Sequence, residues 1–150
     1  MKVSAYVCPG SVAIILMVAF TNGCLLQNVS YSEKLRDNVH ELNDELRWGR
    51  MDLAVTRVAP PYRVAFADMH RPWGRTIQIA DLEIQSLDFG EDRSEAASIV
   101  TFRWYSETTM TLRETTIRQK WERSISGYAI TEVEVIEGDP SLLSSTESTG

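Results

Sequence analysis

The sequence predicts an α+β domain in which N-terminal helices pack against one face of a curved, four-stranded antiparallel sheet. As far as Met69, apolar residues recur at spacings of three and four, which is typical of helices. From Thr76 onward they alternate with polar residues, as in strands. The alternation slips near Ala80-Asp81 and near Ser86, which indicates β-bulges that bend the strand. Helices followed by a run of strands are typical of the α+β class.

The first helix is predicted to begin at Tyr31, because Ser30 and Glu33 have the spacing of a capping box. One apolar stripe follows at alternating spacings of four and three: Leu35, Val39, Leu42, Leu46, Gly49 and Leu53. The same stripe could form a coiled-coil seam with a partner. It spans fewer than three heptads and contains a glycine, which favours packing within the domain. Trp48-Gly49 is expected to break or bend the helix.

Two shorter helices are predicted before the sheet. The first covers residues 51–58 and ends at Ala59-Pro60-Pro61, because the residue before a proline avoids the α conformation. Pro61 can open the second, and Pro72-Trp73-Gly74 stops it. The apolar face of this second helix consists of Tyr62, Ala65, Phe66 and Met69.

Four strands are predicted, at about residues 76–89, 97–108, 111–124 and 128–136. The third strand has well-sorted faces, with Thr115, Ile117, Gln119 and Trp121 on one side and Glu114, Arg118, Lys120 and Glu122 on the other. A face of mixed charge favours contact with solvent over a hydrophobic dimer. The tail at 138–150 is rich in serine and threonine, and it is predicted to be disordered.

Residues 1–23 have the three parts of an export signal. Lys2 is the positive region, Val12–Phe20 is the apolar region, and Thr21-Asn22-Gly23 leads to Cys24. The apolar run is shorter than the roughly 20 residues that span a bilayer. The segment resembles the signal peptide of bacterial lipoproteins, although Thr21 and Asn22 depart from that pattern. The resemblance implies lipid attachment, such as palmitate, at Cys24. The alternative is an ordinary secretory signal that leaves Cys24 as a free thiol.

A lipidated Cys24 implies an address in the bacterial cell envelope. Residues 24–30 would then be a lipidated tether, and several acyl chains would anchor the protein to the membrane effectively permanently. Leu25 follows the cysteine where an aspartate would signal retention at the inner membrane in enteric-type sorting. We therefore expect an outer-membrane lipoprotein that faces the periplasm or the cell surface.

Charge and cysteine content exclude several classes of protein. Removing residues 1–23, whose only charged side chain is Lys2, leaves 14 basic against 21 acidic residues, a net charge of −7. This acidity argues against nucleic-acid binding and against electrostatic adhesion to anionic lipid. The two cysteines are Cys8, within the signal, and Cys24. The folded domain therefore cannot contain a disulfide, a thiolate metal site or a cysteine nucleophile.

Residues 31–137 resemble NTF2-like domains, the cystatin-like cones found in uncharacterised lipoproteins. The resemblance rests on the tryptophan-bearing strand Ile117–Arg123, a glycine turn, and the following Tyr128-Ala129-Ile130. It implies a pocket between the helices and the concave sheet, where enzymes of the fold place an aspartate or histidine base. The candidate pocket-lining residues are Trp48, Phe66, Asp81, Phe102, Trp104 and Trp121. The aromatic members could instead simply fill the core.

No catalytic or metal-binding constellation stands out in the sequence. Asp68, Asp81 and Glu83 are candidate bases; Asp81 could point inward from the phase slip, or occupy a bulge and face solvent. His40 lies on the charged side of the first helix and is predicted to be a surface residue. His70 ends the third helix, where a cation would be favoured by the helix dipole, so we expect a capping role. We therefore expect no catalytic residues, metal ion or cofactor.

The expected function is a non-catalytic, lipid-anchored binding or scaffold module for a protein partner in the envelope. The alternative is a small-molecule binder or cryptic enzyme that uses the cone pocket, with Asp81 as its base.

Overall fold

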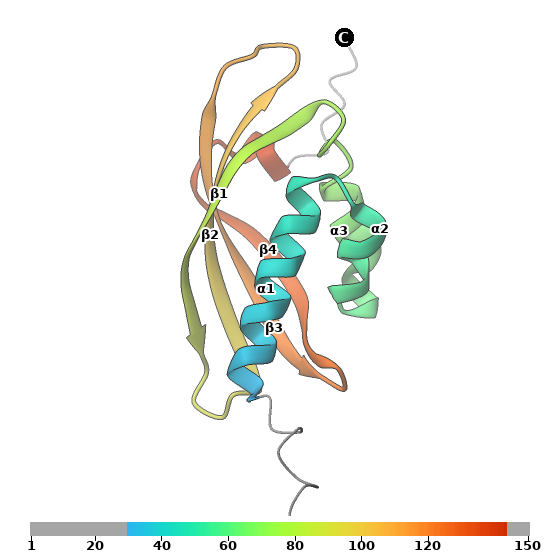
Figure 1. Ribbon diagram of the computed structural model, residues 1–150, viewed down its shortest axis with the longest axis vertical. Helices are drawn as coiled ribbons and strands as arrows, with labels where there is room; N and C mark the ends of the chain where they lie inside the picture. The colour runs from blue at the N-terminus through green and yellow to red at the C-terminus, as the bar shows by residue number, and fades with distance from the viewer. Residues whose placement is uncertain (1–29, 144–150) are drawn as a thin grey trace, which may run out of the picture.

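The computed structural model describes residues 30–143, in which helices lie over one face of a single curved sheet (Figure 1). The predicted α+β class is confirmed. The helical elements before the sheet are α1 (Tyr31–Arg47), α2 (Met51–Ala54), the 3₁₀ turns η1 (Val55–Arg57) and η2 (Pro60–Tyr62), and α3 (Arg63–Met69). The sheet consists of β1 (Ile77–Phe89), β2 (Glu95–Ser106), β3 (Arg113–Ser124) and β4 (Gly127–Gly138), and the 3₁₀ turn η3 (Pro140–Leu143) follows it.

Helix α1 begins where the capping box predicts. The Glu33 amide donates to Ser30 Oγ at 3.3 Å, and the Ser30 amide donates to Glu33 Oε2 at 2.8 Å. The stripe residues Leu35, Val39, Leu42 and Leu46 are completely buried. Gly49 ends the helix with a φ of +66°, and Gly74 lies against it so closely that a Cβ there would come within 2.8 Å of Gly49 Cα. This glycine pair lets the α1–α2 turn approach the chain that enters β1.

The strands form an antiparallel meander in the order β1-β2-β3-β4. The register shifts between Ile79 and Asp81 and between Ile84 and Ser86, so both predicted bulges in β1 are confirmed. Two further shifts lie between β3 and β4. Because bulges increase the local bend of a strand, the sheet curves around α1 (Figure 1).

The free edge of β4 is covered by the turns that follow α2. The Ala59 amide donates to the Ile130 carbonyl at 2.9 Å. Farther along, the Val133 amide donates to the Tyr62 hydroxyl at 3.1 Å. These contacts satisfy backbone groups of an edge strand that would otherwise be open to pairing with another chain.

The prediction of a disordered tail at 138–150 is wrong for its first six residues. Strand β4 extends to Gly138 and η3 follows it, with Leu142 completely buried. The Leu142 carbonyl accepts a hydrogen bond from the Trp73 indole at 2.9 Å. A buried indole N–H needs such an acceptor, so the start of the tail is held down by tertiary contacts that its composition does not reveal. Residues 1–29, which include the proposed signal, Cys24 and most of the tether, lie outside the described part of the chain, as do residues 144–150.

Candidate functional site

The six candidate pocket-lining residues do not surround one cavity. Four of them, Phe66, Phe102, Trp104 and Trp121, are 0–1% exposed and form the core between the helices and the sheet. The Trp104 indole donates to Thr115 Oγ1 at 3.0 Å. Trp104 and Trp121 each touch the wall of a surface hollow, but the two hollows are different. The space that the resemblance assigns to a ligand is therefore occupied by side chains.

The other two candidates lie on the surface. The Asp81 side chain is 53% exposed and forms ion pairs with Arg103 at 3.4 Å and Arg47 at 3.9 Å. Of the two readings of Asp81, the structure shows the bulge residue that faces solvent. Trp48 is 65% exposed, and its indole donates to Asp44 Oδ1 at 3.1 Å.

The remaining titratable candidates are also on the surface. Glu83 and His40 are exposed, and Asp68 is paired with Arg71 one turn away. Within residues 30–143, no group of three or more histidine, cysteine, aspartate or glutamate side chains is arranged to hold a metal ion.

The polar side chains that do point into the fold bond one another. Asn43 of α1 and Gln119 of β3 exchange two amide hydrogen bonds, at 2.8 and 3.1 Å. Ser98 Oγ donates to Gln119 Oε1 at 2.8 Å and accepts from the Trp121 indole at 3.0 Å. Asn43, Ser98 and Gln119 are completely buried, so this network fastens α1 to the centre of the sheet. The four hydrogen bonds of this network occupy its polar groups, so these side chains are not available as catalytic groups.

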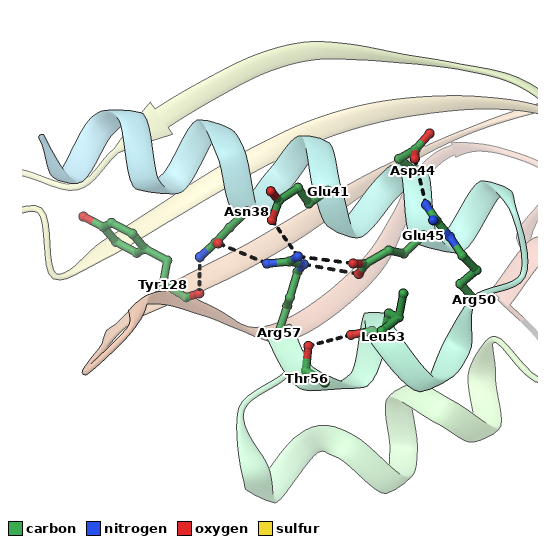
Figure 2. A network of polar contacts seen from close by, with 9 residues as sticks. All are labelled: Asn38, Glu41, Asp44, Glu45, Arg50, Leu53, Thr56, Arg57 and Tyr128. Carbon is green, nitrogen blue, oxygen red and sulfur yellow. Dashed lines mark hydrogen bonds and ion pairs between the residues drawn. The ribbon is translucent and has the colours of Figure 1, made fainter. Parts of the chain in front are cut away.

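A second polar cluster surrounds Arg57, which links η1 to α1 (Figure 2). Its guanidinium donates to both Glu45 oxygens at 3.2 Å and also pairs with Glu41. Asn38 Oδ1 accepts from the same guanidinium at 3.4 Å, while Asn38 Nδ2 donates to the Tyr128 carbonyl at 2.7 Å. The Glu45 side chain is only 9% exposed, so Arg57 neutralises a carboxylate that has little access to water. The cluster therefore has a structural role, holding η1 against α1, and is not a reaction centre.

Replacing Arg57 with methionine is expected to lower the free energy of unfolding by about 2 kcal/mol, because Glu45 would keep its burial and lose its cation. Urea unfolding followed by tryptophan fluorescence measures this loss. Arg36→Met is the matched control, since Arg36 is exposed on α1. It should change stability by less than about 0.5 kcal/mol. Equal effects of the two substitutions would contradict the structural role of Arg57.

A hollow with unpaired charges in its lining lies between the α1–α2 turn, the end of α3 and the turn before β1, and its lining begins at Gly49, the residue after the exposed Trp48. Its volume is about 710 Å³. It is lined by Gly49, Met51, Asp52, Ala67, His70, Arg71, Trp73, Gly74 and Arg75. No described residue forms an ion pair with Arg75 or Asp52, so these charges are available to a ligand.

His70 lies in the wall of this hollow and is completely buried. Its Nδ1 lies 2.8 Å from the Phe66 carbonyl, which can only accept, so Nδ1 carries the proton. Its Nε2 has no hydrogen-bond partner among the described residues. Burial lowers the pKa of His70 to about 4, although the bond to Phe66 acts in the opposite direction. The capping position is as expected, but the ring is neutral, which corrects the expectation of a cation at the helix end.

Another hollow, of about 490 Å³, lies on the outer face of the sheet. Its two cations are already paired, Lys120 with Glu132 and Arg118 with Glu134, both at 2.7 Å, while its Glu95 and Glu122 form no ion pair with a described residue. An anionic ligand here would have to displace these cross-strand pairs, whereas Arg75 in the hollow near Trp48 is unpaired, so that hollow is the better candidate for an anionic group.

Comparisons with known proteins leave the family open. No protein-family model and no curated protein matches the chain. Among solved structures, the chain is similar to the intermembrane space region of the chloroplast protein ARC6, with a TM-score of 0.48 and 14% sequence identity. That likeness covers 66% of this chain and 94% of the other. Within residues 30–143, no helix is both long and apolar enough to cross a membrane.

Proposed function

We propose that this chain is a lipid-anchored binding module of the cell envelope, and that a protein partner contacts Trp48 and the hollow beside it. The observation that carries the proposal is a tryptophan left 65% exposed directly before Gly49, which lines a hollow of about 710 Å³. Tryptophan and arginine dominate the binding energy of protein interfaces, and Arg47 lies over the Trp48 ring at 5.5 Å. A core filled by aromatic residues supports a binding role over catalysis in the cone.

The anchor and the address rest on the lipoprotein resemblance of residues 1–24. In this proposal Cys24 carries the lipid, the outer membrane is the site of attachment, and the domain faces the periplasm or the surface. Metabolic labelling with a fatty-acid analogue tests it. We expect the wild-type protein to be labelled and Cys24→Ala to be unlabelled.

A photo-crosslinking residue placed at Trp48 is expected to capture one discrete partner in living cells. The control is the same residue at Val64, which is 74% exposed on α3 and lies outside the lining of the hollow. Arg75→Glu should reduce the capture at position 48 several-fold, because it reverses the one arginine of the hollow that lacks an ion pair. Two outcomes would contradict a partner site here. One is identical crosslinked products from positions 48 and 64, and the other is an unchanged yield at position 48 in the Arg75→Glu variant.

One observation favours a second function, the binding of a small molecule. The unpartnered Nε2 of His70 is an acceptor, and Arg75 is an unpaired cation in the same hollow. A ligand with an anionic group would suit Arg75, and a donor on the same ligand would reach the buried Nε2 only if the wall of the hollow opened at His70. Asp81 does not support the cryptic-enzyme alternative, since it is exposed and paired with arginines.

A further inference from the structure

The turn between β3 and β4 carries an isoleucine in full contact with solvent. Ile125 and Ser126 alone connect the two strands, and the exposure of Ile125 is 108% of the reference value. Such two-residue turns favour glycine, asparagine and aspartate, because those residues suit both the backbone and water. An isoleucine here serves neither purpose, and its exposure points to a partner outside the domain if other apolar side chains lie beside it.

Other apolar and cationic side chains gather at the same end of the molecule. Tyr31 is 46% exposed, with the Arg123 guanidinium 4.1 Å and the Lys34 ammonium 5.7 Å from its ring centre. Phe89 is 37% exposed and packs edge-on against Tyr128, the second residue of β4. We name this end the basal tip and define it as Tyr31, Lys34, Phe89, Arg123 and Ile125. Figure 1 shows the start of α1, the β1–β2 turn and the β3–β4 turn together at one end of the molecule.

The basal tip is also the end from which the chain leads back toward Cys24. Ser30 lies six residues after Cys24, and an extended segment of that length reaches about 20 Å. An anchor at Cys24 therefore holds the basal tip close to the lipid surface. Helix α1 has 17 residues and is about 25 Å long, and the hollow beside Trp48 lies at its far end.

We infer that the basal tip rests on the phospholipid surface, with Ile125 entering the headgroup region, and that this sets the orientation of the domain. The inference rests on the proposed anchor at Cys24. Tyrosine is favoured at a membrane interface, and arginine and lysine can lie along apolar surface while their charges reach phosphate. Two neighbouring acidic groups, Glu33 and Asp92, are bonded within the protein, to Ser30 and Ser94, while Glu91 and Glu122 next to the tip are exposed.

Orientation is the useful consequence of this contact. One isoleucine is too weak to hold a domain on a bilayer alone, but the anchor removes that requirement by confining the domain to the surface. With the basal tip on the membrane, the Trp48 hollow at the far end of α1 faces away from it. That placement presents the hollow to a partner in the aqueous compartment.

A nitroxide probe at Ser126→Cys tests the inference in the full lipidated protein, reconstituted in vesicles of phosphatidylethanolamine and phosphatidylglycerol. An acylated Cys24 cannot react with the probe, so labelling is confined to the new cysteine. We expect the probe to be accessible to oxygen and shielded from a water-soluble nickel complex. Met110→Cys is the matched control, since Met110 is 70% exposed in the β2–β3 connection at the opposite end, and its probe should stay in water (Figure 1). Adding Ile125→Asp to Ser126→Cys should return the probe to water.

The outcomes separate this inference from the proposed function. Equal exposure to the nickel complex at positions 126 and 110, in protein whose mass shows acylation, overturns the lipid contact and leaves the anchor standing. A mass without acyl chains removes the anchor, and the membrane contact with it. If the probe at position 126 becomes shielded from the nickel complex only when envelope proteins are added, the basal tip binds a protein partner. That result would overturn its assignment to lipid.

Discussion

Replacing Gln119 with leucine is expected to lower the free energy of unfolding by about 3 to 4 kcal/mol, although the size of the side chain hardly changes. The substitution leaves Asn43 Oδ1, one Asn43 Nδ2 proton and the Ser98 hydroxyl proton buried without partners, while Ser98 Oγ still accepts from the Trp121 indole. Each such group costs about 1 to 3 kcal/mol when it is desolvated and unpaired. Urea unfolding measures the loss through the buried residues Trp73, Trp104 and Trp121, which report on the core.

A double substitution separates the loss of hydrogen bonds from a change of packing. Asn43→Leu combined with Gln119→Leu removes both amides together, so it should be less destabilising than the sum of the two single changes by at least about 1 kcal/mol. Gln85→Leu is the control, because Gln85 is exposed on β1 and its acceptor Thr101 Oγ1 keeps Thr116 as a partner, so it should shift stability by less than about 0.5 kcal/mol. Strict additivity of the two core substitutions would contradict a coupled network.

Local patterns predicted most of the secondary structure correctly, because they report local physics. The capping box placed the start of α1, since Ser30 and Glu33 satisfy backbone donors within a single turn. The phase slips placed the bulges of β1, since each slip moves the buried face by one residue. The α1 stripe was correct as far as Leu46. Its last member, Leu53, is 43% exposed because the chain turns at Gly49.

What the patterns missed depends on contacts between distant parts of the chain. The order of residues 138–143 comes from Leu142 and its bond to Trp73, which lies 69 positions earlier. The pairing of Asn43 with Gln119 spans 76 positions and follows from the way α1 seats on β3. Gln119 was placed correctly on the Trp121 face of its strand, but nothing in a strand pattern identifies the residue opposite it.

The candidate site was predicted least well, for a related reason. The aromatic residues assigned to a pocket are large enough to fill the space beneath a single layer of helices, so the core takes them. Trp48 does not belong to the apolar stripe of α1, and this feature of the sequence could have been used to predict that Trp48 is exposed. The hollow near it is built from the α1–α2 turn, the start of α2, the end of α3 and the turn before β1. Gly49 and Gly74 bring the two turns together, and a contact between two glycines produces no periodic pattern in the sequence.

Acidification from pH 6.5 to pH 4 is expected to destabilise the domain by about 3 kcal/mol through His70 alone. The ordinary pKa of histidine is 6.5, and burial lowers that of His70 to about 4. Between these values the unfolded chain binds a proton that the folded chain does not. The contribution of His70 is therefore fully present above pH 6.5, declines as the pH falls toward 4, and falls no further below that. The expected slope is about 1.4 kcal/mol per pH unit, measured by urea unfolding at a series of pH values.

Carboxylates change the free energy of unfolding mainly at lower pH, so the pH range in which His70 titrates can be distinguished from theirs. Hydrogen bonds from Ser94 to Asp92 and from Ser141 to Asp139 hold the pKa values of these carboxyls below the ordinary 3.8, so their contributions are lost only as the pH falls past that range. His70→Phe keeps a ring beside Phe66 and Trp73 but cannot titrate, so its stability should be nearly flat from pH 6.5 to 5. His40→Gln, at an exposed site, should retain the wild-type slope. A His70→Phe protein that still loses stability at the wild-type rate across this interval would show that the buried imidazole is not the group that titrates.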